Sequence, residues 1–210
     1  MALNPKFAIL LDGGFVKAKL SGQNSASQAS DTLRASAHES RNTLLLLDTI
    51  FGYDLLRIYF YDAQPASGTT VNPISGEKTN PGATKTHALN MAPQQKLELR
   101  PNFALRLGKA AVHAWKWGSK AIKYLGAAPG APTADDFVPN IEQKGVDLRI
   151  GLDIARLALG HIVDVIVVVT GDRDFVLAFK FARREAVRVY LEHMGHGVKR
   201  DLKAHADIVL

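Results

Sequence analysis

The chain has 210 residues, of which 47% are hydrophobic and 22% charged, a composition that excludes a disordered protein and permits one sizeable core. It contains no cysteine, which excludes disulfides and thiolate zinc sites. The net charge of +6 favours a polyanionic partner, because lysine and arginine that neutralise phosphates release condensed counterions.

The amino-terminal part predicts two strands separated by a helix. Residues 7–11 are all apolar and precede Asp12 and two glycines, which is typical of a strand covered on both faces. Apolar residues at three- and four-residue steps over 31–51 predict a helix with one buried face. Residues 55–61 alternate in polarity and predict a strand that ends at Asp62.

No apolar stretch approaches the ~18 residues that span a membrane, so we expect a cytoplasmic protein without a membrane partner.

The middle of the chain predicts loops around a few regular elements. Residues 63–85 and 126–140 are rich in Gly, Pro, Ser, Thr and Asn, and both stretches predict loops. Between them we expect one helix and two strands, at residues 87–100, 103–107 and 110–117. The two strands would join near Gly108.

The carboxyl-terminal part predicts alternating helices and strands. Residues 146–159 predict a largely buried helix whose apolar stripe is Leu148, Leu152, Ala155 and Leu159, widened by Ile150, Ile154 and Leu157. The elements that follow are strand 163–169, helix 175–184, strand 187–191 and helix 198–206, with Leu202 buried in the last. This alternation predicts an α/β fold with a mainly parallel sheet between two helix layers. We expect a single domain over residues 1–210 with a loop-rich insertion at about 63–140.

Several of the predicted strands end in an aspartate. Asp12, Asp62 and the pair Asp172 and Asp174 follow strands, and Asp147 begins a helix. Because parallel strands present their carboxyl ends at one edge of a sheet, these side chains can meet there. Crowded carboxylates repel one another unless a hard cation lies among them, so the pattern predicts a magnesium or manganese site. Such ions suit phosphodiester hydrolysis.

The same residues also have structural interpretations. An aspartate at a strand-to-helix turn often accepts backbone N–H bonds, and Asp147 is suited to an N-cap. The pair Asp172 and Asp174 favours function, because one carboxylate suffices for a cap. His193 and His196 have a spacing seen in metal sites, but no further ligand stands at a fixed distance from them, which disfavours zinc.

Two further patterns favour packing over chemistry. Asp153 lies about 120° around its helix from Asp147, so we expect it outside the site and paired with Arg149 or Arg156. Residues 115–117 interleave tryptophans with a lysine, as surfaces for single-stranded nucleic acids do. Core packing of at least one tryptophan is the simpler interpretation.

Together, the motifs LLDGGF, YFYDAQP, KGVDLRIGLDIARLA and VVVTGDRDFVLAFKFARREAVRVYLE resemble the NYN domain family, of the LabA-like branch. They occur in the family's order over most of the chain from residue 6 to about 210. The resemblance implies a compact PIN-like α/β fold and a ribonuclease in which magnesium or manganese activates the water that attacks RNA. It implies that Asp12, Asp147, Asp172 and Asp174 are catalytic and bind the metal, with Asp62 as a further ligand.

The resemblance also suggests which residues contact RNA. At two positions this chain differs from the pattern of the family. Thr170 would orient the phosphate or the water, and candidates for the RNA backbone are Lys144, Arg173, Arg183 and Arg184. Many nucleases of this group carry an asparagine where this chain has Phe15, a change within the site itself. The family often has proline where this chain has Leu177, which affects only the start of a helix.

We therefore expect a metal-dependent endoribonuclease. One alternative is a catalytically weak or inactive NYN module that binds RNA or a protein partner in a regulatory role. A phosphatase of the haloacid dehalogenase type is disfavoured, because it needs a second aspartate where this chain has Gly14. Cleavage of DNA and homo-oligomer formation both stay open.

Overall fold

A seven-stranded sheet forms the centre of the fold, and the computed structural model describes residues 4–21, 52–83, 85–124 and 131–210. The strand order is β6-β5-β2-β1-β7-β8-β9. These strands are β1 (Lys6–Asp12), β2 (Asp54–Gln64), β5 (Phe103–Trp117), β6 (Phe137–Lys144), β7 (Val165–Val169), β8 (Arg188–Glu192) and β9 (Ile208–Val209). Neighbouring strands are parallel except β5 and β6. The predicted α/β class with a mainly parallel sheet is confirmed.

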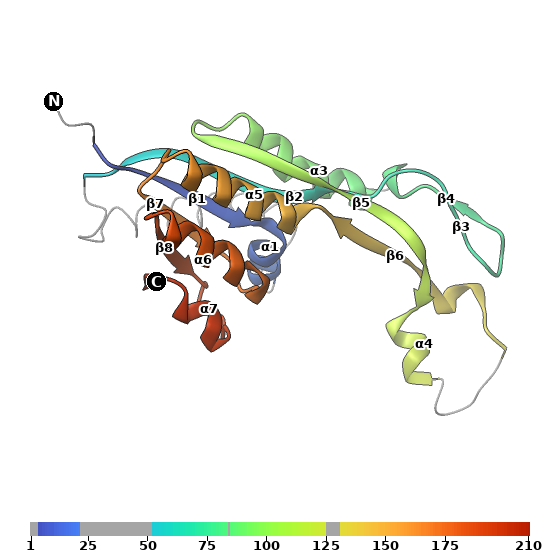
Figure 1. Cartoon of the computed structure of the whole chain (residues 1–210). Helices are drawn as coiled ribbons and strands as arrows, with labels where there is room; N and C mark the ends of the chain where they lie inside the picture. Colours follow the sequence, from blue (N-terminus) through green and yellow to red (C-terminus); the bar gives the residue numbers. More distant parts are fainter. Residues whose placement is uncertain (1–3, 22–51, 84, 125–130) are drawn as a thin grey trace.

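Helices cover both faces of this sheet (Figure 1). One face packs against α5 (Val146–Leu159), α6 (Val176–Arg184) and α7 (Arg200–Ala204). The other face packs against α1 (Gly13–Ser21) and α3 (Lys85–Glu98). The result is the expected α/β/α arrangement of three layers. In the described ranges, no helix is long and apolar enough to cross a membrane.

The two central strands, β1 and β7, are the most deeply buried. Residues 7–11 and 165–169 are apolar throughout and buried throughout, because helices cover both faces of these strands. From β1 the chain passes to β2 and β5 on one side, and it returns to β7 on the other side. Strand order therefore reverses between β1 and β7, where open parallel sheets form a crevice beyond their carboxyl ends.

The buried face of α5 differs from the predicted stripe. Leu148, Leu152 and Leu159 are 66%, 59% and 59% exposed, whereas Ile154 and Leu157 are buried. The exposed leucines and the buried apolar residues both recur at three- and four-residue steps, so either set describes an amphipathic helix. The packing of α5 on α6, β2 and β5 decides which set faces the core.

Strand β2 and the region after it also differ from expectation. The last half of β2, residues 58–63, is buried on both faces, so its alternation in polarity does not mark an exposed side. Within the expected loop 63–85, a hairpin forms from β3 (Thr70–Val71) and β4 (Lys78–Thr79). The predicted helix 87–100 is confirmed by α3, whereas the predicted helix 31–51 lies outside the described residues.

One continuous strand, β5, replaces the two strands that were expected. Gly108 makes no turn there; a Cβ at this position would lie 2.6 Å from the carbonyl oxygen of Lys144. The glycine therefore permits the close approach of two backbones. β6 begins at Phe137, inside the expected loop 126–140, because it pairs with the outer half of β5.

The outer half of β5 and the whole of β6 form a two-stranded arm that extends past the other strands (Figure 1). The helix α4 (Ser119–Tyr124) lies at its end. On this arm Trp117 stacks on Phe137 with ring centroids 4.6 Å apart. Trp115 and Trp117 are both half-buried and neither joins the core, which corrects the expected core packing of a tryptophan.

The carboxyl-terminal elements follow the prediction closely. Helix 175–184 corresponds to α6, and strand 187–191 corresponds to β8. The closing helix is the shorter α7, with Leu202 fully buried as expected. The short edge strand β9 was not predicted, because two residues give no periodicity to detect.

Candidate metal and nucleic-acid site

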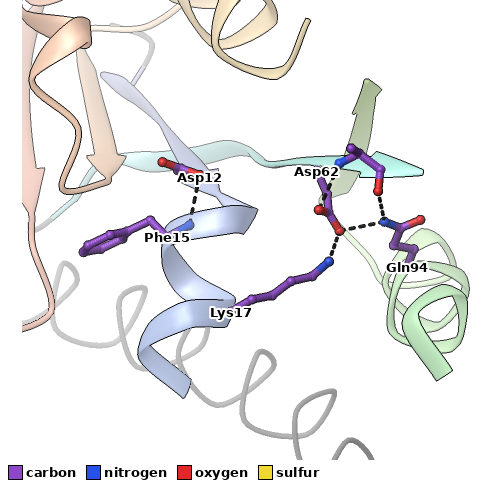
Figure 2. A network of polar contacts seen from close by, with 6 residues as sticks. Asp12, Phe15, Lys17, Asp62 and Gln94 are labelled. Carbon is purple, nitrogen blue, oxygen red and sulfur yellow. Dashed lines mark hydrogen bonds and ion pairs between the residues drawn. The ribbon is translucent and has the colours of Figure 1, made fainter. Parts of the chain in front are cut away.

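Asp12 is the last residue of β1, which pairs with β7. One carboxylate oxygen accepts a 3.1 Å hydrogen bond from the backbone N–H of Phe15, in the first turn of α1 (Figure 2). The other oxygen accepts a 3.0 Å hydrogen bond from the Thr170 hydroxyl, directly after β7. Two elements from opposite ends of the chain thus fix the orientation of Asp12.

The loop after β7 brings two more carboxylates to this edge. The backbone N–H of Asp172 donates to the Thr170 hydroxyl at 3.1 Å. The Asp172 carboxylate in turn accepts a 2.9 Å hydrogen bond from the N–H of Asp174 and caps the 3-10 helix Arg173–Phe175. One aspartate is therefore the cap, and Asp174 remains as an additional exposed carboxylate.

The aspartates of this edge interact electrostatically. Burial raises the pKa of Asp12, and the nearby charges of Asp147 and Asp172 raise it further. Burial also raises the pKa of Asp147, together with the charges of Asp172 and Asp174. The N-cap of α5 is Gly145, with a φ of 77°, so the N-cap interpretation of Asp147 is wrong. Within the described ranges none of the four forms an ion pair.

These four residues offer oxygen ligands only, which suit magnesium or manganese. Among the described residues, no three acidic or histidine side chains already stand close enough to hold one ion. Magnesium needs no such cage, because it commonly binds through one or two carboxylates and keeps several waters. Each oxygen of Asp12 accepts one hydrogen bond from the described residues and retains a lone pair. The donor chemistry therefore fits the ion.

Asp62 has a different environment from the other aspartates (Figure 2). It is 1% exposed and forms an ion pair with Lys17 of α1. The side chain of Gln94 donates to one of its oxygens at 2.6 Å, and the N–H of Ala63 donates to the other at 2.9 Å. Its carboxylate joins α1 and α3 to β2, and we leave it out of the ligand set that we propose.

The basic residues expected to contact RNA fall into two groups. Lys144 ends β6, close in sequence to Asp147, and Arg173 stands between Asp172 and Asp174. Arg183 and Arg184 are in the last turn of α6, which leads away from this edge. At about 1.5 Å per residue, the helix carries them roughly 11–12 Å from its start.

Phe15, Lys19 and His196 form a basic and aromatic cluster that the sequence did not predict. Lys19 Nζ lies 2.7 Å from His196 Nδ1 and 5.8 Å from the centroid of the Phe15 ring. The Phe15 ring meets His196 edge-on, with centroids 5.8 Å apart, and a Cβ on Gly171 would lie 2.6 Å from that ring. The one feature of the sequence that could have predicted this cluster is the four-residue spacing of Phe15 and Lys19, which places them on one face of a helix.

Asp153 pairs with a residue that sequence proximity did not suggest. Its carboxylate accepts hydrogen bonds from Arg106 at 2.9 Å and from the Tyr61 hydroxyl at 2.8 Å. The pKa of Tyr61 is raised, mainly by burial and also by the charge of Asp153. The expected pairing with Arg149 or Arg156 is therefore wrong, because Asp153 faces the sheet.

Residues 114–210 match the family model described as the NYN domain. The carboxyl-terminal part of the chain is therefore similar to NYN domains. NYN domains belong to the PIN-like nuclease superfamily. The matched range includes Asp147, Asp172 and Asp174, and Asp12 lies before it. The match does not separate the branches of the family, and the LabA-like branch stays a prediction.

Similarity to other proteins is distant. A crystal structure of a protein of unknown function from Vibrio parahaemolyticus aligns with this chain at a TM-score of 0.47 and 15% sequence identity. The alignment covers 100% of this chain and 95% of that one. No curated protein matches the sequence.

Proposed function

We propose that this NYN domain is a ribonuclease that hydrolyses phosphodiester bonds of RNA with magnesium or manganese. The observation that supports it best is the raised pKa of Asp12 and of Asp147, each with neighbouring carboxylates among its causes. These residues come from β1 and α5, yet both are influenced by Asp172 after β7. A divalent ion between them would remove their repulsion.

The proposed ligands are Asp12, Asp147, Asp172 and Asp174. When bound, the ion would lower the pKa of a water and neutralise charge on the phosphate. Thr170 holds Asp12 through its hydroxyl and accepts the amide of Asp172, so it positions two ligands at once. The amide of Phe15 restrains the other oxygen of Asp12. These contacts fix the carboxylates before the ion or the RNA arrives.

RNA would enter across the basic residues around this edge. Lys19 and His196 lie beside Phe15, whose amide contacts Asp12, and Lys144 and Arg173 lie near the other aspartates. Lysine and arginine bind the phosphates of a nucleic acid strand irrespective of its sequence. The net charge of +6 supports such a partner.

A cleavage assay tests this proposal. A fluorescent single-stranded RNA is incubated with the protein in manganese, in magnesium and in EDTA. We expect cleavage only with the metals, and a loss of at least about 100-fold in Asp172→Asn, on the order of what one electrostatic group contributes to a transition state. Asp54→Asn, at the opposite end of β2, is the matched control and should cleave normally.

A second candidate function is that of an NYN module that binds RNA or a protein without cleaving. Phe15 supports it, because an apolar side chain that packs against His196 stands at the position where related nucleases carry an asparagine. The Phe15→Asn variant separates the two candidates. If wild type binds RNA without cutting it and Phe15→Asn restores cutting, the module has lost its activity through this residue. Cleavage by wild type that requires Asp172 excludes the second candidate.

A further inference from the structure

An open hollow of about 400 Å³ lies at the edge of the sheet opposite the aspartates. It is lined by Arg183, Arg184, Ala186, Val187, Arg188 and Asp207. The helix α6 ends at this edge and β8 begins there, whereas Asp12 and Thr170 stand at the carboxyl ends of β1 and β7. The hollow is therefore separate from the candidate metal site.

Its single carboxylate is already engaged. One oxygen of Asp207 lies 3.0 Å from Nε of Arg183, and the other accepts a 2.8 Å hydrogen bond from the N–H of Val189. Asp207 thus neutralises and orients one guanidinium. In the described part of the chain, no carboxylate pairs with Arg184 or Arg188, and both side chains are exposed. Arg188 also interacts with Tyr190 and with the charge of Asp207. Three arginines against one aspartate give the lining a net charge of +2.

Stabilisation of a helix end does not account for this grouping. Cations in the last turn of α6 interact favourably with its free carbonyl groups, which explains Arg183 or Arg184. Arg188 belongs to β8 and has no such role. The chain reverses at Ala186, with a φ of 61°, and this turn brings Arg188 back to the same hollow. Three arginines from two elements line the same hollow.

We propose that this hollow binds a phosphate monoester. Such a group carries a charge of about −1.5 to −2 near neutral pH, which matches the net charge of +2 of the lining residues. Guanidinium groups donate paired N–H bonds to phosphate oxygens, which a lysine cannot reproduce. The volume lies at the lower end of the range of about 300–1,000 Å³ for small-molecule sites. A phosphodiester, with a single charge, would bind more weakly.

Calorimetry with three adenosine derivatives tests the proposal. The probes are adenosine 5′-monophosphate, adenosine 3′,5′-cyclic monophosphate and adenosine, titrated into full-length Asp172→Asn protein in EDTA. These conditions remove metal binding at the aspartates, so the result is independent of the proposed nuclease. We expect saturable binding of the monophosphate, affinity at least about fivefold lower for the cyclic diester, and no binding of adenosine.

Variants of the arginines assign the binding to the hollow. Arg188→Gln and Arg184→Gln should each weaken binding of the monophosphate at least about fivefold, and Arg188→Lys should give a smaller loss because it keeps the charge. Arg149→Gln, on the exposed face of α5, is the control and should bind as the parent protein does. Circular dichroism confirms that each variant is folded.

Three results would overturn the proposal: no binding of the monophosphate, equal binding of adenosine, or unchanged binding in both folded glutamine variants. A further comparison identifies the source of the phosphate. RNA oligonucleotides with a 5′-phosphate or a 5′-hydroxyl are titrated under the same conditions. Tighter binding of the phosphorylated end indicates an RNA terminus as ligand, and equal binding indicates a free nucleotide.

Discussion

The hydroxyl of Thr170 donates a 3.0 Å hydrogen bond to Asp12, although 158 residues separate the two in the sequence. The contact exists because β1 and β7 are neighbours in the sheet and end at the same edge. Thr170 is fully buried and also accepts the amide of Asp172. One side chain therefore connects two of the proposed metal ligands.

Replacing Thr170 with valine should weaken metal binding while the fold is retained. Valine has a similar shape but leaves an oxygen of Asp12 and the amide of Asp172 without their partner. Loss of a residue that orients a ligand typically reduces metal affinity about 10- to 100-fold. Manganese titration by calorimetry measures this, and Thr170→Ser, which keeps the hydroxyl, is the control. Equal affinity in wild type and Thr170→Val would contradict the positioning role.

The raised pKa of Asp147 predicts how stability depends on pH without metal. Because the folded state favours the protonated carboxyl, its ionisation costs stability as the pH rises through the raised pKa. Asp147→Asn should therefore raise the melting temperature near neutral pH in EDTA, and the difference should vanish below the unfolded value of 3.8. Scanning calorimetry across this range measures it. In saturating manganese, wild type should melt at a higher temperature than Asp147→Asn, since the variant loses a ligand of the ion. A variant that is less stable than wild type in EDTA near neutral pH would contradict the raised pKa of Asp147.

Lys19 should contribute to binding of RNA through a phosphate. In Lys19→Met the slope of log affinity against log salt concentration should become smaller by about 0.7, the value for one contact with a single strand. The binding is measured by fluorescence anisotropy with Asp172→Asn protein, so that no RNA is cut. Lys6→Met is the matched control, since Lys6 starts β1 at the other edge of the sheet. If both variants retain the parental slope, Lys19 has no contact with the phosphates.

The Lys17–Asp62 ion pair should be important for stability. Asp62 is 1% exposed, so Lys17→Met leaves a buried carboxylate without its counter-charge. Loss of one partner of a buried pair typically costs about 3–5 kcal/mol, and the lower end applies here because Lys17 is partly exposed. Urea unfolding measures the change. The double variant Lys17→Met with Asp62→Asn should recover part of the loss, and additive effects of the two changes would show that the pair is not coupled.

Two adjacent glycines should respond oppositely to alanine. A Cβ on Gly13 would lie 2.4 Å from the carbonyl oxygen of Tyr61, whereas one on Gly14 would meet its nearest atom, in Asp12, at 3.4 Å. Gly13→Ala should therefore cost about 1–3 kcal/mol, as overpacking does. Gly14→Ala should be neutral or stabilising by up to about 1 kcal/mol, because alanine favours a helix. Urea unfolding of both variants checks this, and equal effects would contradict the contact with Tyr61.

The sequence predicted the central elements well because their signals are local. The apolar runs 7–11 and 165–169, the helix α6 and the buried Leu202 were all recognised from their patterns. The strand β6 and the two-residue strand β9 were missed, since they exist through pairing with other strands and not through a pattern of their own. Gly108 was interpreted as a turn because its contact with β6 is invisible in the sequence.

By itself, the sequence determined the α/β class and the positions where aspartates follow strands, because strand and turn preferences depend on neighbouring residues. Only the tertiary structure decided which side chains contact each aspartate. It brought Thr170 to Asp12, engaged Asp62 with Lys17, and turned Asp153 toward Arg106. Charges interact through space, so the environment of a carboxylate is set by the packing of elements that the sequence keeps far apart.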